Sequence, residues 1–333
     1  MDSFTQIVLG AAVADVLLGK KLGNRAMLYG AVVATLPDLD MFIGKLYDPI
    51  SALMVHRGFS HSIVFFLMAS PLLGWLVARL EYQKVPDWRE AGRMVFYCLF
   101  THALLDAFTT WGTQLLWPLP WRVALQSIFV IDPLYTLPFV YCVIRAMRLG
   151  RSDSRRRLWV RRGLVISSAY LLLTLAVKSV VWYRFTDDLD QKSIAYKSLS
   201  TKPTPFNIVL WNATVATDRG YLLADYSVFD TAPIQWKEYK HGREQLGQLA
   251  QSAVVRQLIT ISEGCYVITR KDESLFFNDL RFGLFNQNPD KPEFVFSYAL
   301  QEHNGLVTAT EVPNRTAGRG KALLKRLWER ITS

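Results

Sequence analysis

Charged residues and cysteines are scarce in this 333-residue sequence, and its first apolar run lacks the features of an N-terminal targeting signal. Only 20% of the residues are charged, below the roughly 25% of soluble globular domains, whereas 51% are hydrophobic. Three scattered cysteines exclude a disulfide framework and a paired-cysteine metal site. The first apolar run follows Asp2 and precedes Lys20 and Lys21, so it does not resemble a signal peptide with its leading basic residues. Together these absences favour a membrane protein.

Six apolar segments precede residue 184, and several approach the roughly 20 residues that a membrane-spanning helix needs. They predict a polytopic α-helical membrane domain of about six helices over residues 1–183. The lipid bilayer is therefore an expected partner of this domain. The segments are Phe4–Leu18, Met27–Ile43, Ser60–Leu80, Met94–Thr110, Phe129–Met147 and Leu164–Tyr183.

Basic residues are distributed unevenly over the loops between these segments. Fifteen Lys and Arg residues follow the first, third and fifth segments, whereas the loops after the second and fourth hold only Lys45, Arg57 and Arg122. The positive-inside rule therefore predicts a cytoplasmic location for the first set and an extracytoplasmic N-terminus.

The net charge of +10 could instead indicate nucleic-acid binding. However, residues 1–183 carry a surplus of 8 positive charges and residues 184–333 only 2. We thus expect no nucleic-acid partner.

Residues 184–333 are more polar than the preceding part and contain short β-rich runs. They predict a mostly β (α+β) extracytoplasmic domain. Helical spacing of apolar residues predicts one helix over Arg243–Ile261, and a short basic helix is expected over Gly320–Ile331. Asp279 and Arg281 alternate with apolar neighbours, so they could form a cross-strand pair or line a groove, but a structural turn is the preferred interpretation. The predicted strands are Asn207–Val215, Tyr221–Phe229, Cys265–Arg270, Leu275–Phe277 and Phe294–Gln301.

Two clusters of ionisable residues lie beside the second and third apolar segments, where such groups are costly and are functional candidates by default. Asp38 and Asp40 follow Pro37, which breaks a helix, so both carboxylates can turn toward one cation. A solvated helix end is the structural alternative.

His56 and His61 lie five residues apart across a glycine and can bind one metal. The alternative is an interfacial loop. Between the two histidines, Arg57 can hold a phosphate or carboxylate and Ser60 can cap the next helix.

The third cluster is the pair His102 and Asp106 within the fourth apolar segment. Their spacing of four residues places both side chains on one helix face. A hydrogen bond between the two that stabilises the bundle is the structural alternative. Cys98 and Thr109 extend the same face, and packing explains Cys98 adequately.

The predicted topology brings all three clusters to the outer ends of their segments. Three histidines and several aspartates there form a mixed nitrogen and oxygen ligand set, which suits Zn²⁺, with Mn²⁺ or Fe²⁺ as alternatives. Such a metal lowers the pKa of bound water to about 7 in favourable sites. Asp2, Gln6 and Asp132 are expected at the same face.

The N-terminal part of the sequence resembles the YbcI/YdjM-type family of bacterial inner-membrane proteins. The resemblance covers about residues 1–140 and implies a polytopic protein of the inner membrane with a metal-binding hydrolytic centre. Many members carry His where this chain has Gln6, so that position departs from the pattern. The implied site positions are Asp38, Asp40, His56, His61, His102 and Asp106. The matching stretches are MDSFTQIVLGAAVADVLLGKKLGNRAMLYG, TLPDLD, HRGFSHS, FTHALLDAFTTWGTQLLWP and IDPLYTLP.

The leading hypothesis is a metal-dependent hydrolase at the periplasmic face of the inner membrane. Its substrate would be amphiphilic, such as a phospholipid or a lipid-linked phosphoester, with amide or carboxyl ester bonds as alternatives. Asp40 or Asp106 would act as general base, and Arg57 would bind the anionic part of the substrate. A metal-ion or proton transporter could use the same residues, although Asp15 is the sole buried acid expected toward the cytoplasm. An envelope scaffold or sensor acting through its β domain is a third possibility.

Overall fold

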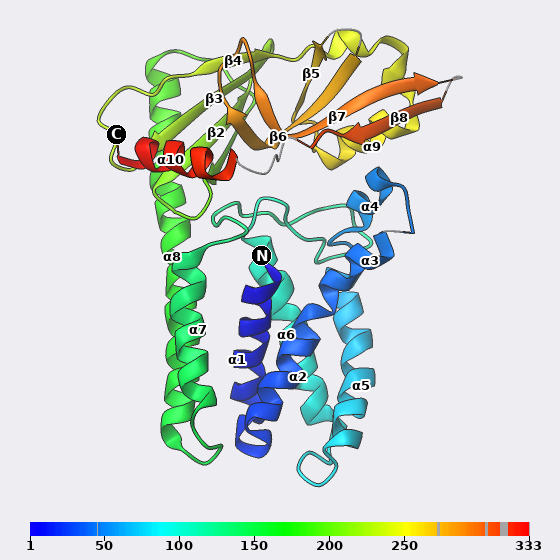
Figure 1. The fold of residues 1–333 in the computed structure, drawn as a ribbon, viewed down its shortest axis with the longest axis vertical. Coiled ribbons are helices and arrows are strands. Elements are labelled where there is room, and N and C mark those ends of the chain that lie inside the picture. Colours follow the sequence, from blue (N-terminus) through cyan, green and yellow to red (C-terminus); the bar gives the residue numbers. More distant parts are fainter. Residues whose placement is uncertain (45, 272–273, 304–305, 314–318, 333) are drawn as a thin grey trace. The chain divides into compact units, whose positions relative to one another are not determined.

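The computed structural model describes residues 1–44, 46–271, 274–303, 306–313 and 319–332, so the predicted loop residue Lys45 lies outside the described residues. The chain forms two compact units (Figure 1). The first, here called the helical unit, comprises Met1–Leu46, Val55–Ala176 and Pro205–Asn207. The second, the β unit, comprises Tyr47–Met54, Val177–Thr204 and Ile208–Ser333. The division falls within the long helix α8.

The helical unit consists of helices whose starts are fixed by short polar side chains. Asp2, Ser62, Asp87 and Asp132 accept hydrogen bonds from backbone N–H groups in the first turns of α1, α5, α6 and α7. Pro37 ends the regular course of the second helix, as predicted. The elements are α1 (Ser3–Leu22), α2 (Asn24–Thr35), the 3-10 turn η1 (Pro37–Leu39), α3 (Asp40–Gly44), η2 (Phe59–His61), α5 (Ile63–Leu80), α6 (Trp88–Ala107), α7 (Pro133–Met147) and the first part of α8 (Ser154–Gln191).

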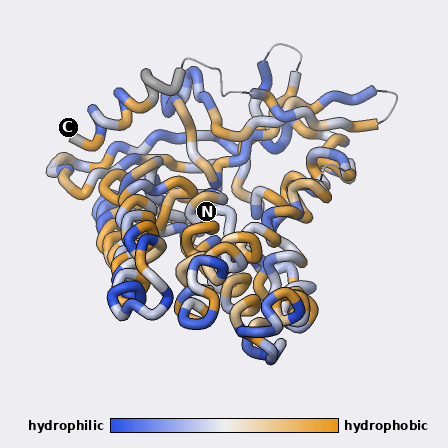
Figure 2. The backbone as a smooth tube through the Cα atoms, turned by 60° about the horizontal axis from the view of Figure 1, so that its bottom comes forward, coloured by the Kyte–Doolittle hydropathy of each residue, from blue (hydrophilic) through white to orange (hydrophobic). Residues whose placement is uncertain are grey.

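Four helical stretches among the described residues are long and apolar enough to cross a membrane: Ser3–Leu22, Asn24–Gly44, Ile63–Leu80 and Ser154–Gln191. Of the six spanning helices predicted, four are therefore supported by their length and composition. Helix α7 is apolar but has only 15 residues. Helix α6 has 20 residues but includes Arg89, Glu90, Arg93 and Asp106, which lower its apolar character. Figure 2 shows the largely hydrophobic helices of this unit and the hydrophilic loops that join them.

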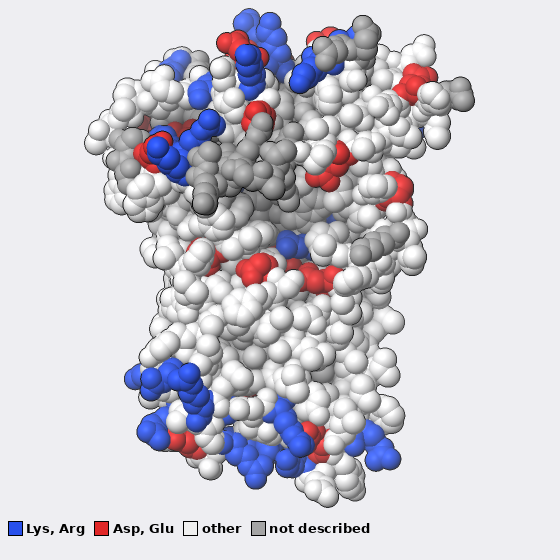
Figure 3. Space-filling model, in the orientation of Figure 1, with Lys and Arg blue, Asp and Glu red and all other residues white. Residues whose placement is uncertain are grey.

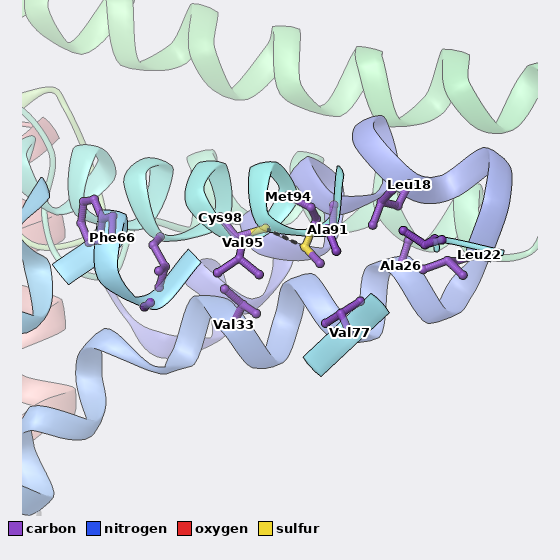
Figure 4. Close-up of a cluster of buried hydrophobic side chains, with 14 of the residues drawn as sticks. Leu18, Leu22, Ala26, Val33, Phe66, Val77, Ala91, Met94, Val95 and Cys98 are labelled. Atoms are coloured by element: carbon purple, nitrogen blue, oxygen red, sulfur yellow. Dashed lines mark hydrogen bonds between the residues drawn. The ribbon is translucent and has the colours of Figure 1, made fainter. Parts of the chain in front are cut away.

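Small residues bring neighbouring helices into close contact. A Cβ atom on Gly10 would lie 2.3 Å from the carbonyl oxygen of Gly30, and one on Gly74 would lie 2.5 Å from Gly92 Cα. Glycine is therefore required where α1 meets α2 and where α5 meets α6. Around these contacts the core includes the fully buried Cys98 (Figure 4). Its thiol donates to Gly10 O at 3.5 Å. The packing role expected for Cys98 is confirmed.

Basic residues of the helical unit gather at one end of its helices (Figure 3). Hydrogen bonds join the three loops at this end: Lys21 Nζ donates to Glu90, Arg25 to Glu81, and Asn24 Nδ2 to Met147 O. The loops after the first, third and fifth predicted segments therefore share one end, here called the basic end. Asp15 was predicted to be the sole buried acid at this end, but Glu81 is buried as well.

The β unit contains two antiparallel four-stranded sheets, in the orders β1-β2-β3-β4 and β5-β6-β7-β8. Strands β1, β4 and β8 lie outside the strands predicted from the sequence. The strands are β1 (Ser198–Pro203), β2 (Leu210–Ala216), β3 (Gly220–Ser227), β4 (Lys237–Lys240), β5 (Tyr266–Lys271), β6 (Ser274–Asn286), β7 (Glu293–His303) and β8 (Leu306–Glu311). Helix α4 (Pro49–Val55), the 3-10 segment η3 (Arg243–Gln251), α9 (Ala253–Ile261) and α10 (Arg319–Thr332) complete the unit.

Two expectations for the β unit need correction. The single helix predicted over Arg243–Ile261 is divided, because Gly247 has non-helical backbone angles (φ 49°) and Ser252 caps a new helix, α9. Asp279 and Arg281 lie within strand β6 and not in a turn. They pair with each other along this strand, with Arg281 NH2 2.8 Å from Asp279 Oδ2, beside a break in the register between β6 and β7.

Candidate metal centre

Three segments of the helical unit place four ionisable side chains at one point. Asp38 lies in η1, where Pro37 has interrupted the helix. His61 ends η2, which follows a sharp turn at Arg57 with a positive φ of 56°. His102 and Asp106 lie one turn apart on α6. Residues 38, 61 and 102–106 are distant in the sequence, and the fold brings them together.

The donor atoms of these four residues, here called the four-residue cluster, lie within 4.8 Å of one another. The Nε2 atoms of His61 and His102 are 3.2 Å apart. Asp106 Oδ2 lies 3.4 Å from each of these nitrogens, and Asp38 Oδ1 lies 3.6 Å from each. The side chains of His61, His102 and Asp106 are fully buried, and that of Asp38 is 16% exposed.

The spacing and chemistry of the cluster fit a divalent metal ion. Zinc binds four ligands tetrahedrally at roughly 2.0–2.2 Å, so its ligand atoms are about 3.3–3.6 Å apart. The five separations given above, 3.2–3.6 Å, are close to this range, and the sixth, between Asp38 and Asp106, is within 4.8 Å. In addition, Asp106 Oδ2 is buried without a hydrogen-bond partner among the described residues. A shared cation would satisfy this carboxylate oxygen and the two imidazole nitrogens that it faces.

Asp40 and His56 lie outside the four-residue cluster and contact each other, with His56 Nδ1 2.9 Å from Asp40 Oδ1. The second carboxylate oxygen of Asp40 accepts hydrogen bonds from the Arg57 backbone N–H and from Ser60 Oγ, each at 2.9 Å. Ser60 Oγ in turn lies 3.0 Å from His61 Nδ1. Asp40 therefore orients His61 through Ser60, an arrangement typical of metal-binding histidines. The helix cap predicted at Ser60 is at Ser62 instead.

Arg57 is 5% exposed, and its guanidinium group lies against the cluster. NH2 lies 3.2 Å from Asp106 Oδ1, and NH1 donates to Thr109 Oγ1 at 2.9 Å. Nε is buried without a hydrogen-bond partner among the described residues. Arg57 thus compensates the Asp106 charge, and its Nε atom remains available as a donor.

Two contacts of Asp106 could not be predicted from the residue pattern. Gln6 Nε2 donates to Asp106 Oδ1 at 3.1 Å and to His102 O at 3.2 Å. The N-terminal amine of Met1 also donates to Asp106 Oδ1. Gln6 was expected at this face, whereas helical spacing gives no indication for Met1. Asp2 and Asp132 cap helices and do not join the cluster.

The profile of the family described as YdjM inner membrane protein matches residues 1–181, more than half of the chain. The chain belongs to this family. It is 31% identical to inner membrane protein YbcI of Escherichia coli (strain K12) over 156 residues, which cover 41% of this chain and 85% of YbcI. It is 35% identical over 106 residues to inner membrane protein YdjM of the same strain and to that of Shigella flexneri, covering 28% of this chain and 49% of either relative.

The family assignment confirms the resemblance found in the sequence. It establishes a protein of an inner-membrane family, and the names of its relatives state a location and no reaction. No solved structure matches the chain. All four cluster residues lie within the matched part, and most of the β unit lies beyond it.

Proposed function

We propose that this chain is a membrane-bound, metal-dependent hydrolase with its site at the periplasmic face of the inner membrane. The observation that carries the proposal is the four-residue cluster, whose donor atoms all lie within 4.8 Å inside a unit of apolar helices. Buried ionisable groups are rare in such helices unless they have a function. Two imidazoles and two carboxylates are also a common ligand set of hydrolytic metal sites.

Asp38, His61, His102 and Asp106 would hold the metal, most simply Zn²⁺, with Mn²⁺ or Fe²⁺ as alternatives. When bound, such an ion lowers the pKa of water at the site and polarises the bond to be cleaved. His61 is oriented by Ser60 and Asp40, whereas His102 is fixed by the rigid helix α6.

Proton transfer at the site would involve the carboxylates of Asp40 and Asp106. Asp106 already contacts Arg57, so its charged form is stabilised and serves metal binding best. Asp40 contacts His56, whose side chain is 24% exposed. A proton taken up at the Asp40 carboxylate can therefore pass to the imidazole and on to solvent, which makes Asp40 the stronger candidate for the general base.

Arg57 would bind the anionic part of the substrate. Its buried Nε has no hydrogen-bond partner among the described residues and can donate to a substrate oxygen, while NH1 and NH2 remain held by Thr109 and Asp106. This fixed donor would stabilise charge that develops during cleavage. The arrangement supports an amphiphilic substrate with an anionic headgroup, such as a phospholipid or a lipid-linked phosphoester.

The proposed orientation rests on the basic end of the helical unit, which the positive-inside rule places in the cytoplasm. The cluster residues lie near the opposite ends of their helices, since His102 and Asp106 are in the last turns of α6 while Arg89 and Arg93 are near its start. With this orientation the site and the β unit are periplasmic. A periplasm-specific reporter enzyme fused to the C-terminus should be active, and activity of a cytoplasm-specific reporter would contradict this topology.

A transporter for metal ions or protons is the alternative that uses the same residues. Transport requires a series of exchangeable groups across the membrane. At the basic end the buried acids are already paired, because Arg156 Nε donates to Asp15 at 3.0 Å and Arg25 NH1 donates to Glu81 at 3.0 Å. These pairs count against an ion path. An envelope scaffold or sensor would explain the β unit but not the cluster.

Metal analysis of the detergent-purified full chain tests the proposal, followed by a hydrolysis screen with phospholipids, phosphoesters, esters and amides. We expect about one or two equivalents of zinc, manganese or iron. The variant Asp132→Asn is a matched control, because it removes a buried carboxylate that caps α7 and is not part of the cluster. It should retain the metal. Wild-type protein that carries no stoichiometric metal and gains none on reconstitution would contradict the hydrolase proposal.

A further inference from the structure

The connection between α6 and α7, residues 108–132, combines an ordered backbone with an apolar surface. Its 25 residues include only two charged ones, Arg122 and Asp132. A backbone bridge joins Thr113 to Val123, and Leu125 N donates to Ala107 O at 2.7 Å. Large apolar side chains are nevertheless exposed: Leu116 (51%), Trp117 (37%), Leu119 (43%) and Trp121 (66%). This group is here called the apolar rim.

The apolar rim is attached directly to the residues around the four-residue cluster. Gln114 N donates to Arg57 O at 3.1 Å, and Arg122 NH2 donates to His56 O at 3.0 Å. The ring centroids of Trp117 and Phe59 are 5.0 Å apart. Any surface that covers the rim therefore lies next to the His56–Arg57 turn.

The rim also continues the apolar surface of a candidate spanning helix. Ile63, the first residue of α5, donates its N–H to Leu115 O at 3.0 Å. In the first turns of α5, Val64, Leu67 and Met68 are 40%, 62% and 63% exposed, as expected for side chains that face lipid. Tryptophan is enriched at the boundary between headgroups and acyl chains because its ring is apolar and its N–H is polar. By contrast, the connections at the basic end carry many charges.

We propose that the apolar rim is inserted into the interface of the bilayer's outer leaflet and presents membrane lipids to the four-residue cluster. An ordered, nearly uncharged loop with exposed Leu and Trp side chains is costly in water, and immersion of this surface in lipid removes the cost. The acyl chains of a lipid would contact Leu119 and Trp121, while its headgroup reaches the His56–Arg57 turn. The presentation step rests on the proposed hydrolase function, whereas insertion of the rim does not.

Insertion can be measured without any enzymatic activity. The variants Trp121→Cys and Leu119→Cys would carry an environment-sensitive fluorophore in full-length protein reconstituted into phosphatidylethanolamine–phosphatidylglycerol vesicles. A Cys265→Ser background suppresses labelling at the partly buried native cysteine, and Cys98 and Cys142 are buried. The matched control is Asp218→Cys, at a side chain of the β unit that is 85% exposed.

We expect spin-labelled phospholipid to quench the labels at 121 and 119 at least threefold more than the label at 218, and aqueous iodide to show the reverse order. Equal quenching by iodide at all three positions would place the rim in water. Protection of positions 119 and 121 from both quenchers would indicate that protein covers the rim. Either result would overturn the proposal.

Presentation of lipid is tested by comparing two substrates in the variant Trp121→Glu. Turnover of a bilayer phospholipid should fall at least tenfold, while turnover of a short-chain, water-soluble analogue stays within twofold of wild type. Equal losses on both substrates would overturn the presentation step. If wild-type protein cleaves neither substrate, the proposed phospholipid substrate and the presentation step fail together, and the quenching measurement still decides whether the rim is inserted.

Discussion

Asp15 and Asp106 are both buried carboxylates in the helical unit, yet their surroundings differ in kind. Asp15 faces one cation, Arg156, whose guanidinium group also donates to Asn24 Oδ1 at 2.7 Å and to Leu149 O at 3.0 Å. That network joins the start of α8 to α1 and α2. Asp106 faces Arg57 on one oxygen and two imidazoles on the other.

The different partners of Asp15 and Asp106 indicate how a buried charge with a structural role can be distinguished from one with a functional role. At the basic end, charges and hydrogen bonds are satisfied within the protein, so the Asp15–Arg156 pair has a structural explanation. In the four-residue cluster, two carboxylates and two imidazoles converge with their donor atoms facing one another, and Asp106 Oδ2 has no hydrogen-bond partner among the described residues. A bound cation would satisfy this group, as the proposed function assumes. Burial alone does not distinguish the two regions, whereas the type of partner does.

The variant His102→Ala should produce the largest effect. It removes one of four donors, so bound metal should fall below one tenth of the wild-type content and hydrolysis should fall about 10²–10⁴-fold. The protein should remain inserted and folded. Metal analysis and turnover of the purified variant check this expectation. If His102 only stabilises the bundle, the variant would lose thermal stability with no change in metal content.

The variant Asp15→Asn should have the opposite profile. It leaves the charged, 2% exposed Arg156 without its carboxylate, which typically costs about 3–5 kcal/mol of stability. Thermal unfolding in detergent should therefore occur at a lower temperature, while the metal content of the folded fraction is unchanged. The double variant Asp15→Asn/Arg156→Met should recover most of the loss. Reduced metal content in folded Asp15→Asn protein would contradict the separation of the two regions.

Much of the membrane part could be predicted from sequence, because the physics of its segments is local. Apolar runs, the break at Pro37 and the uneven loop charges are visible in the residues themselves. The strands β1, β4 and β8 were missed for a different reason. β1 contains Thr201, Lys202 and Pro203, whose polar and proline character resembles a loop, and only pairing with β2 makes this segment a strand.

The four cluster residues were all among the predicted metal ligands, but Asp40 and His56 were predicted as ligands too and lie outside the cluster. All six aspartates and histidines that were named lie in or beside one site. Their order of contact was not predictable, since Asp38 and Asp40 are two residues apart and yet only Asp38 joins the four-residue cluster. The turn at Pro37 sends the Asp40 side chain to His56 instead. Contacts such as those of Gln6 and Ser60 depend on tertiary packing, for which a single sequence has no signal.

The variant Arg57→Lys sharpens the comparison within the cluster itself. The ammonium group of Lys can replace the charge that faces Asp106, but its three donors share one nitrogen. It cannot reproduce the planar guanidinium, whose separate nitrogens reach Thr109, Asp106 and a substrate oxygen at the same time. We expect metal content to stay near that of wild type and kcat to fall about 10²-fold, the typical effect of losing one transition-state donor. Single-turnover kinetics with metal analysis of the same preparation checks this. Loss of metal in this variant would show that Arg57 serves only to hold Asp106.

The smallest expected effect concerns Asp230 in the β unit, where Arg330 attaches helix α10 beside strand β3. Burial raises the pKa of Asp230, but hydrogen bonds from Arg330 and from the Ser227 N–H outweigh it, so the pKa lies below its usual value. A carboxyl with a lowered pKa in the folded state stabilises that state at neutral pH. This contribution is lost as the pH falls through the folded-state pKa.

We therefore expect α10 to loosen as the pH falls below about 4, because Asp230 of the detached state, with an ordinary pKa near 3.9, binds a proton in that range. The carboxyl paired with Arg330 binds one only at lower pH. The effect should be below about 1 kcal/mol, as for other partly exposed ion pairs. The fluorescence difference between wild type and Trp328→Phe, measured from pH 7 to pH 3, isolates the α10 tryptophan. The same measurement in an Asp230→Asn background should show no transition in this range. A transition that persists without the Asp230 carboxylate would mean that another group controls how this helix is attached.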